Sequence, residues 1–351
     1  MNKIKNVLTV NECFSDNLGD QAIAKSLEDA LLKNNCRVTK VDFTRTITKV
    51  IKSSTQPNLT KKNLLRKFLT RKPALIIYWF LKNYFRLMRQ AKKNYDSVFI
   101  GGGQLILNNE IFPLALFFWT KFFYKKSDIH LFAIGVGNDF DWFSKFCICS
   151  SLKRFKSISV RDELSQKNLF SNFNVESVVI PDIAYTLPVS EYSNKTKGNY
   201  DLVGITDFEV YTKYREEVGN SILTLEGYFN LWSTLISDNK LKNVLLSATT
   251  NKDLQLSFKF REYIKKQGLP CEIELSNELP TLDEYLDLLQ GASKVISGRM
   301  HSLILGEVAN CEVITFQISS KLSSYEIERV KTNNSEKYRL LDNRICQLLN
   351  S

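Results

Sequence analysis

An arginine and a histidine stand two positions apart in the stretch ISGRMHSL, residues 296–303. The chain holds only two histidines, so His301 is a rare group that can transfer protons near neutral pH. Arg299 can clamp a carboxylate or a phosphate with the planar fork of its guanidinium. Ser297 and Gly298 suit a turn after a β-branched run, and both Arg299 and His301 are expected in the first turn of the helix that follows, where N–H groups favour anions. The spacing therefore indicates proton transfer on an anionic substrate.

A histidine at such a turn can also be purely structural, as buried imidazoles often are. The other one, His130, precedes the apolar run LFAIG and is interpreted as structural. If the protein uses histidine for proton transfer, His301 is the better candidate.

The stretch NLGD, residues 17–20, lies between a predicted strand and a predicted helix. Asp20 is expected as the N-cap of that helix, and Gly19 would supply the turn. Asn17 and Asp20 could also bind the hydroxyls of a sugar, since amide and carboxylate groups suit them. The two interpretations are compatible.

Glycines or charges follow other predicted strands. Gly102 and Gly103 in FIGGGQLI would allow close backbone approach and offer N–H groups to an anion. They match neither the dinucleotide fingerprint nor a Walker loop, which argues against NAD and ATP. Gly137 in AIGVGND belongs to a tight turn or to a ligand contact. Arg161 in SVRDELS forms a surface salt bridge or, at a cleft, clamps a carboxylate or phosphate.

These residues require a scaffold of alternating strands and helices. Short apolar runs separated by helical patterns predict parallel sheets with helices on both faces, and the pattern restarts after a polar linker at 190–200. We expect an α/β fold of two doubly wound Rossmann-like domains facing a cleft, with ligands beyond the carboxyl ends of the strands. The expected parts are residues 1–189 with a basic helical insertion at about 58–95, residues 198–330, and a C-terminal helix at 331–351 that packs back on the core.

The composition, with 44% hydrophobic and 24% charged residues in 351, is that of a globular protein. The seven cysteines show no zinc-like spacing, which favours reduced thiols in the cytoplasm and no metal site. No signal peptide is expected, and the apolar runs at 74–81 and 112–123 fall short of the roughly 20 residues that span a bilayer.

A basic segment, residues 61–93, holds eleven lysines and arginines, several aromatic residues and no acid. It is interpreted either as a helical hairpin that packs its apolar stripe on the core and solvates its lysines, or as a surface that contacts an anionic membrane. Nucleic acid is not expected as a partner, because no nucleic-acid module accompanies the segment.

Taken in order, several motifs resemble the polysaccharide pyruvyl transferase family. They are NLGDQAI (17–23), GGGQLI (101–106), GVGN (135–138), VRDELS (160–165), PDIAY (181–185), SGRMHSL (297–303) and the lysine of FQISSK (316–321). The resemblance implies a fold like that of GT-B glycosyltransferases. It also implies transfer of a pyruvyl group from phosphoenolpyruvate to two hydroxyls of a sugar, on a glycan or a lipid-linked oligosaccharide, with formation of a cyclic ketal and release of phosphate.

On this resemblance His301 is the candidate general acid or base, with Arg299 and Asp20 as further catalytic candidates. Phosphoenolpyruvate would be held by Arg161, Arg299 and Lys321. The remaining substrate-binding candidates are Asn17, Gly19, Gly102, Gly103, Gly137, Ser297 and Gly298. No cofactor is expected besides the donor substrate, and the chemistry does not demand a metal.

Two other hypotheses remain open at this point. A GT-B glycosyltransferase that uses a nucleotide sugar would share the architecture; glutamates spaced by eight occur at Glu209/Glu217 and Glu328/Glu336, away from the turn near residue 298. A non-enzymatic partner of a membrane polysaccharide assembly complex would use the 61–93 segment as its contact. In every case we expect a cytoplasmic protein, with peripheral contact at the inner face of the membrane as a further expectation.

Overall fold

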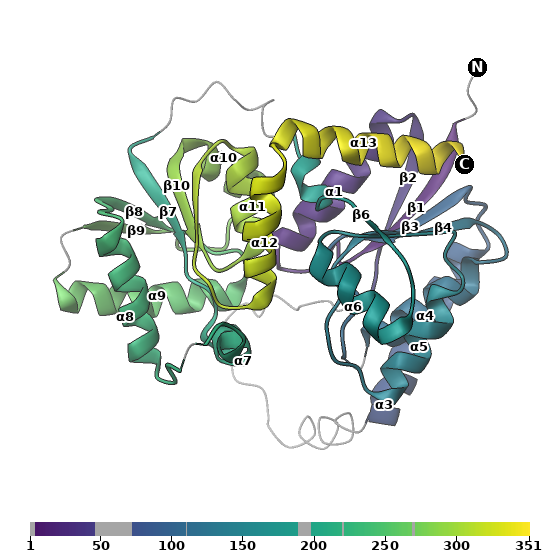
Figure 1. Cartoon of the computed structure of the whole chain (residues 1–351), viewed down its shortest axis with the longest axis horizontal. Helices are drawn as coiled ribbons and strands as arrows, with labels where there is room; N and C mark the ends of the chain where they lie inside the picture. The colour runs from purple at the N-terminus through teal and green to yellow at the C-terminus, as the bar shows by residue number, and fades with distance from the viewer. Residues whose placement is uncertain (1–3, 46–71, 110, 189–197, 220, 269–270) are drawn as a thin grey trace. The chain divides into compact units, whose positions relative to one another are not determined.

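The computed structural model describes residues 4–45, 72–109, 111–188, 198–219, 221–268 and 271–351. The chain divides into two compact units, each built around its own sheet (Figure 1). Unit 1 comprises Met1–Ser15, Leu27–Asp182 and Asn343–Ser351. Unit 2 comprises Asp16–Ser26 and Ile183–Asp342. The expectation of two parallel α/β units is confirmed.

Unit 1 holds a six-stranded parallel sheet in the order β2-β1-β3-β4-β5-β6. Its strands are β1 (Lys5–Asn11), β2 (Cys36–Asp42), β3 (Ser97–Gly101), β4 (Asp128–Ile134), β5 (Ser157–Val160) and β6 (Val178–Val179). In β1, Val7 pairs with Val38 of β2 on one side and Ser97 of β3 on the other. Central strands that are buried on both faces explain the continuous apolar runs in the sequence.

The helices of unit 1 follow the strands in turn. They are α3 (Lys72–Ala91), α4 (Phe112–Phe123), α5 (Trp142–Leu152) and α6 (Glu163–Phe173). The helix α1 (Leu18–Lys33) is divided between the two units, and so is α13 (Asn334–Asn350). Two buried indoles fix α3 and α4 to the end of β2, because Trp79 donates to the backbone oxygen of Thr44 and Trp119 to that of Phe43.

The described part of the basic segment is not an insertion, as the sequence had suggested. Residues 58–71 lie outside the described residues, and α3 is the crossover helix between β2 and β3. Trp79, Leu87 and Ala91 on its inner face belong to the main core of unit 1. The interpretation of this segment as helical, with an apolar stripe packed on the core and its lysines in solvent, agrees with this inner face.

Unit 2 holds a five-stranded parallel sheet in the order β11-β10-β7-β8-β9. Its strands are β7 (Tyr200–Gly204), β8 (Asn243–Leu246), β9 (Glu272–Leu275), β10 (Ala292–Ser297) and β11 (Glu312–Thr315). Its helices are η1 (Ile183–Thr186), α7 (Phe208–Tyr214), η3 (Arg215–Val218), α8 (Leu225–Asp238), α9 (Asn251–Gln267), α10 (Leu282–Gly291), α11 (Met300–Val308) and α12 (Ser320–Lys331). Threonine side chains cap α8, α9 and α10, which fixes where these helices begin.

The chain passes from unit 1 to unit 2 between Asp182 and Ile183, before the expected boundary at 189–198. Residues 189–197 of the expected linker lie outside the described residues. The last helix begins at Asn334 rather than 331, and its final part, from Asn343, belongs to unit 1. No helix within the described ranges has the length and apolar character needed to cross a bilayer.

A buried ionic network holds the start of α13 within unit 2. The ammonium of Lys337 lies 3.3 Å from Glu307 and 4.2 Å from the ring centre of Tyr185. The same carboxylate accepts hydrogen bonds from Tyr185 (2.9 Å) and Tyr325 (2.6 Å). Burial lowers the pKa of Lys337 against the opposing effect of Glu307. Charges this well paired can be buried without a large net penalty, so the network fixes η1, α11, α12 and α13 together.

Candidate functional site

The carboxyl edge of the sheet in unit 2 gathers most of the predicted site residues. β7, β8 and β10 end there, and α9 and α11 begin there (Figure 1). The start of α1 joins them, because Leu18 donates its N–H to Thr249 at 3.0 Å and Asn251 donates to Asp16 at 3.0 Å. Three helix N-termini therefore converge on one edge, an arrangement that favours anions.

The turn between β10 and α11 is fixed by its small residues. The hydroxyl of Ser297 accepts the N–H of Arg299 at 3.0 Å and donates to the carbonyl of Gly204 at 3.2 Å. A Cβ on Gly298 would lie 2.6 Å from the hydroxyl of Thr206, so only glycine fits. Arg299 is the extended N-cap residue and α11 begins at Met300, which corrects the expectation that Arg299 lies within the first turn.

The guanidinium of Arg299 is bound through two nitrogens to Asp253, with Nε at 3.0 Å and Nη2 at 2.6 Å from its carboxylate oxygens. This finding corrects the expectation that the bidentate fork is available to a substrate. None of the residues in the described ranges bonds the third nitrogen, Nη1, of Arg299. Burial by itself would lower the pKa of Arg299, but the nearby carboxylates outweigh it and raise that pKa.

Asp253 is the central acceptor of this edge. Its side chain is 1% exposed, and it accepts the backbone N–H of Asp207 at 2.8 Å and the hydroxyl of Thr249 at 3.3 Å. One carboxylate thus ties the loops after β7 and β8 to the cap of α11. A buried charge with this many donors is a fixed positioning element.

His301 is the second residue of α11 and is 8% exposed. Its ring lies against Gly19 of α1, where an added Cβ would come within 2.5 Å of Nδ1 and 2.8 Å of the histidine Cβ. Gly19 is therefore needed for close approach of the imidazole to the N-terminus of α1. The structure therefore places His301 next to Gly19. Asn17 and Asp20 lie close by in the chain, two residues before and one residue after Gly19.

The cap of α1 is Asn17 rather than Asp20. The side chain of Asn17 accepts the N–H of Gly19 at 3.0 Å, and α1 begins at Leu18. Asp20 is the third helical residue and is half-buried, which is a favourable place for an acid near a helix N-terminus.

Lys321 lies in the first turn of α12 and is half-buried. The preceding segment runs along the turn after β10, because an added Cβ on Gly298 would lie 3.3 Å from Ile318 and 3.4 Å from the backbone oxygen of Phe316. Lys321 is thus carried on a chain segment that borders the Ser297–Arg299 turn.

The other four predicted residues belong to unit 1. Gly102 and Gly103 have φ angles of 75° and 70°, which explains the choice of glycine. Their backbone groups hold the loop after β4: Gly102 donates to Phe132 and Gly103 accepts from Gly135, both at 2.8 Å. Gly137 donates to Ile106 at 2.8 Å. The N–H group of Gly102 is therefore bonded to β4 and that of Gly137 to Ile106, contrary to the expectation that such groups face an anion.

Arg161 is buried, with its side chain 3% exposed. Nε lies 3.3 Å from Asp162 and Nη1 lies 3.5 Å from Asp182. Its guanidinium also fills the space beside Gly135, where a Cβ would lie 2.7 Å away. The expectation of a substrate clamp at Arg161 is not supported by this geometry, because the carboxylates of unit 1 already hold its fork.

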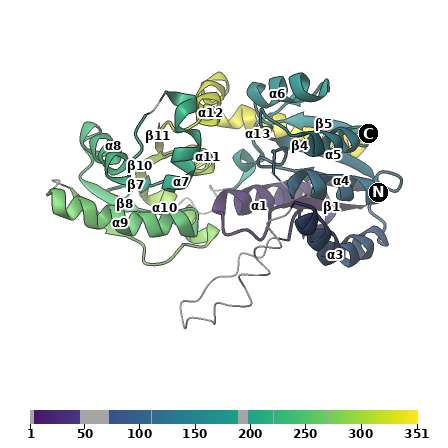
Figure 2. The same ribbon diagram turned by 90° about the horizontal axis from the view of Figure 1, so that it is seen from below.

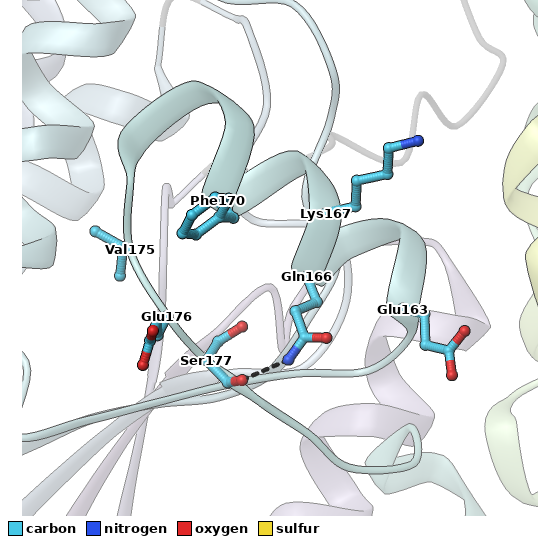
Figure 3. Close-up of a pocket in the computed structure, with 7 residues that line it drawn as sticks. All are labelled: Glu163, Gln166, Lys167, Phe170, Val175, Glu176 and Ser177. Carbon is cyan, nitrogen blue, oxygen red and sulfur yellow. Dashed lines mark hydrogen bonds between the residues drawn. The ribbon is translucent and has the colours of Figure 1, made fainter.

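A hollow of about 410 Å³ lies beside α6, away from these residues (Figure 3). It is lined by Glu163, Gln166, Lys167, Phe170, Val175, Glu176 and Ser177. Gln166 donates to the backbone oxygen of Ser177 at 2.6 Å across it. None of the predicted site residues lines it. Within the described ranges no three His, Cys, Asp or Glu residues form a group that could hold a metal ion.

Sequence reasoning missed Asp253 and its partners in the loops after β7 and β8. Thr249 and Asp253 lie in SATTNKD, directly after β8, and Asp207 lies in GITDFE, directly after β7. The signal was the one used for the other sites, namely polar residues at the carboxyl end of a predicted strand.

Solved structures show the class to which this fold belongs. One similar solved structure is the UDP-GlcNAc 2-epimerase from Neisseria meningitidis bound to UDP-GlcNAc, with 10% identity, a TM-score of 0.53 and coverage of 98% of this chain and 99% of that one. Another is the UDP-GlcNAc 2-epimerase from Methanocaldococcus jannaschii, with 12% identity, a TM-score of 0.50 and the same coverage. These are GT-B fold enzymes, so the GT-B-like expectation is confirmed.

The model of the polysaccharide pyruvyl transferase family matches residues 17–320. The chain therefore belongs to this family, as the resemblance of its motifs had indicated. A search of curated proteins found no match. The matched range contains every predicted site residue except Lys321, which lies directly after it.

Proposed function

We propose that this protein transfers a pyruvyl group from phosphoenolpyruvate to two hydroxyls of one sugar, in a cell-surface polysaccharide or its lipid-linked precursor. The products are a cyclic ketal and phosphate. The observation that carries the proposal is the placement of Arg299 and His301 at the convergence of three helix N-termini, in a chain of the pyruvyl transferase family. A dianionic or trianionic donor suits that concentration of N–H groups and positive charge.

The reaction starts with a proton delivered to the methylene carbon of phosphoenolpyruvate. The adjacent carbon becomes oxocarbenium-like, and the first sugar hydroxyl adds to it and loses its proton. The bond to the phosphate oxygen then breaks, and the second hydroxyl adds and loses its proton to close the ring. One proton is taken up and two are released, and the net proton leaves with the phosphate, so the reaction balances without a further reactant.

In this proposal His301 delivers the first proton and accepts one from a hydroxyl, a contribution typically worth about 10²- to 10⁴-fold in rate. Its ring lies against Gly19, in the first turn of α1. Arg299 supplies a donor through Nη1 while Asp253 holds its other face. Lys321 adds charge from α12, and Asp20 orients the acceptor hydroxyl.

No cofactor is required by these steps, since the donor carries the leaving group. Because all of the residues named above lie in unit 2, we propose that unit 2 holds the donor. Among the substrate-binding candidates of unit 1, Gly102 and Gly137 use their backbone N–H groups in hydrogen bonds within the fold.

The test is incubation of the full chain with phosphoenolpyruvate and a panel of free and lipid-linked glycans. We expect released phosphate together with the mass increment of a pyruvyl ketal on one glycan, and no phosphate release without a glycan. Phosphate release with no modified glycan would indicate simple hydrolysis and would contradict the proposal.

Stabilisation by added ligand distinguishes this function from that of a glycosyltransferase, which would transfer a sugar from a nucleotide sugar. We expect phosphoenolpyruvate, but neither UDP nor GDP, to raise the melting temperature. The first pair of glutamates spaced by eight already forms contacts within the protein. Glu209 pairs with Lys252, and Glu217 accepts hydrogen bonds from the N–H and the hydroxyl of Ser320 at the start of α12. Stabilisation by UDP or GDP alone would favour the glycosyltransferase hypothesis.

A further inference from the structure

The outer face of α3 is apolar although it faces solvent. Ile77, Tyr78, Leu81 and Phe85 are all exposed, and Phe85 is 79% exposed. Their spacing places them along one side of the helix, opposite Trp79 and the other buried residues. Unit 1 thus uses one side of α3 for its core and leaves a second apolar stripe uncovered by any described residue.

Ring contacts lead from this stripe onto α4 and α5. Phe85 contacts Tyr84 at 5.6 Å, and Tyr84 contacts Phe80 at 5.3 Å. The ring of Phe80 lies 4.7 Å from that of Phe118 on α4. On the far side of α4, Phe117 contacts Phe118 at 5.4 Å and Phe146 of α5 at 6.4 Å. Phe146 is exposed, as is Trp142 one turn earlier, at 80%. The three helices lie next to one another in both views (Figure 1 and Figure 2), and we call their outer side the three-helix face.

The segments that form the three-helix face are strongly basic, although Arg86 points inward to the backbone oxygens of Asp42 and Phe43 and Lys156 pairs with Asp128. The segments 72–93, 112–126 and 142–156, which contain these helices, hold 13 of the 48 lysines and arginines and none of the 37 acidic residues. The rest of the chain therefore has 35 basic and 37 acidic residues, so these segments account for the whole positive net charge of +11. Cations sit on the aromatic rings themselves: Arg154 lies 4.8 Å and Lys121 5.6 Å from the ring centre of Phe117.

We propose that the three-helix face binds the surface of an anionic lipid membrane. Exposed aliphatic and aromatic side chains at the level of the head groups, flanked by lysines and arginines, are the features of an interfacial membrane contact. The proposal extends the expected contact of residues 61–93 to α4 and α5, and it does not depend on the reaction proposed above.

Two other occupants fit this face less well. A second copy of the face would bring two sets of unbalanced positive charge together, which is unfavourable. A nucleic acid would use the charge and the rings but would leave Ile77 and Leu81 in water, since aliphatic side chains offer bases no stacking surface.

The test is co-sedimentation of the full chain with vesicles of phosphatidylcholine alone or of phosphatidylcholine with phosphatidylglycerol. We expect binding to the anionic vesicles only, and weaker binding as the salt concentration rises. Leu81→Ser/Phe85→Ser removes exposed apolar groups, and Lys121→Glu/Lys125→Glu reverses two exposed charges. Each double variant should weaken vesicle binding by more than about tenfold. The lysine variant loses roughly 1 kcal/mol or more per reversed charge near an anionic surface, and the apolar variant loses roughly 1.5–3 kcal/mol per large side chain that would be buried.

Matched controls lie on unit 2. Ile327→Ser/Val330→Ser removes two exposed apolar residues of α12, and Lys265→Glu/Lys266→Glu reverses two exposed lysines of α9. These should bind vesicles like the wild type. Equal loss in the controls, or no vesicle binding by the wild type, would overturn the proposal.

Two further outcomes would assign the face to another partner. If Leu81→Ser/Phe85→Ser converts a dimer to a monomer in size-exclusion chromatography without changing vesicle binding, the face is a contact between copies. If only the lysine variant loses binding and a DNA oligonucleotide competes fully, the face is a general polyanion site. Turnover on a soluble glycan should be unchanged in all four variants, so failure here is distinguishable from failure of the proposed reaction.

Discussion

Two nitrogens of Arg299 meet the buried carboxylate of Asp253, a residue 46 positions earlier in the chain. The pair joins the cap of α11 to the first turn of α9. It sets the plane of the guanidinium and leaves Nη1 as its one nitrogen unbonded by a described residue. We conclude that Asp253 is a positioning residue for Arg299, and that the direction in which Arg299 can donate is decided by the fold.

Replacing Asp253 by asparagine keeps its volume and removes its charge. We expect a loss of unfolding free energy on the order of 3 kcal/mol, because the half-buried guanidinium loses its counter-charge. Urea unfolding measures this loss. The exposed pair of Lys265 and Glu262 is the control, since Glu262→Gln should change stability by less than about 0.5 kcal/mol.

Arg299→Lys should also be damaging, because an ammonium cannot bond both oxygens of Asp253 and still reach a ligand. We expect phosphoenolpyruvate to stabilise this variant markedly less than the wild type in a thermal-shift titration. Full retention of the ligand-induced shift would show that Nη1 does not hold the donor.

Gly19→Ala places a methyl group against the imidazole of His301. We expect a loss of about 1–3 kcal/mol in unfolding free energy, as for other overpacked sites, together with a large fall in turnover. In a His301→Gly background the added methyl has room, so Gly19→Ala should cost little stability there. A double-mutant cycle by urea unfolding measures this coupling, and additive effects would mean that the two residues do not touch.

His301→Ala should reduce the release of phosphate from phosphoenolpyruvate almost completely, by about 10²- to 10⁴-fold in turnover. The fold should persist, since the residue lies at the edge of the sheet. Circular dichroism checks the fold and a phosphate assay the rate. Turnover near that of the wild type would remove His301 from the mechanism.

Arg161→Met should lower the free energy of unfolding without changing the binding of phosphoenolpyruvate. Its loss leaves Asp162 and Asp182 without this buried cation, at an expected cost of about 3–5 kcal/mol. Any protein that folds should respond to phosphoenolpyruvate like the wild type. A selective loss of the ligand response, with stability unchanged, would restore Arg161 as a substrate clamp.

His130 predicts a pH dependence of stability. Burial lowers its pKa from the usual 6.5 to about 4, with Nδ1 2.8 Å from the hydroxyl of Ser157. Between these pH values the unfolded chain binds a proton that the folded chain does not, so stability is lost as pH falls from about 6.5 toward 4. At pH 5 this loss should be on the order of 2 kcal/mol relative to pH 7.5.

Urea unfolding at both pH values provides the measurement. His130→Gln removes the titrating group and can still bond Ser157, so its stability should fall less over the same range. An equal fall in both proteins would assign the pH dependence to other groups.

The sequence predicted the parallel α/β architecture and the Arg299–His301 turn because both depend on local patterns. Alternating apolar strands and helices define the sheet, and glycine with a nearby charge marks the strand end. The sequence could not predict that Asp253 binds two nitrogens of Arg299. That contact depends on β8 lying beside β7, and β7 beside β10, in the folded sheet.

The same limit explains the errors at Arg161 and α3. A sequence does not show whether a charged residue after a strand faces a ligand or a buried carboxylate. Arg161 faces the buried carboxylate of Asp182. In α3 the many lysines and arginines indicated an insertion, although the helix is the crossover between β2 and β3. Its apolar stripe does pack on the core through Trp79 and Leu87, as the helical interpretation expected. Local composition does not show which side of a helix is buried when both sides are apolar.

The division of α1 between the units has a consequence for synthesis. Gly19 and the cap of α1 leave the ribosome long before Ile183 and the rest of unit 2. At about 5–20 residues per second, the nascent chain must keep this segment accessible for roughly ten seconds or more. The imidazole of His301 can find its neighbour only near the end of translation, so the site matures last, when nearly all of the polypeptide has already emerged.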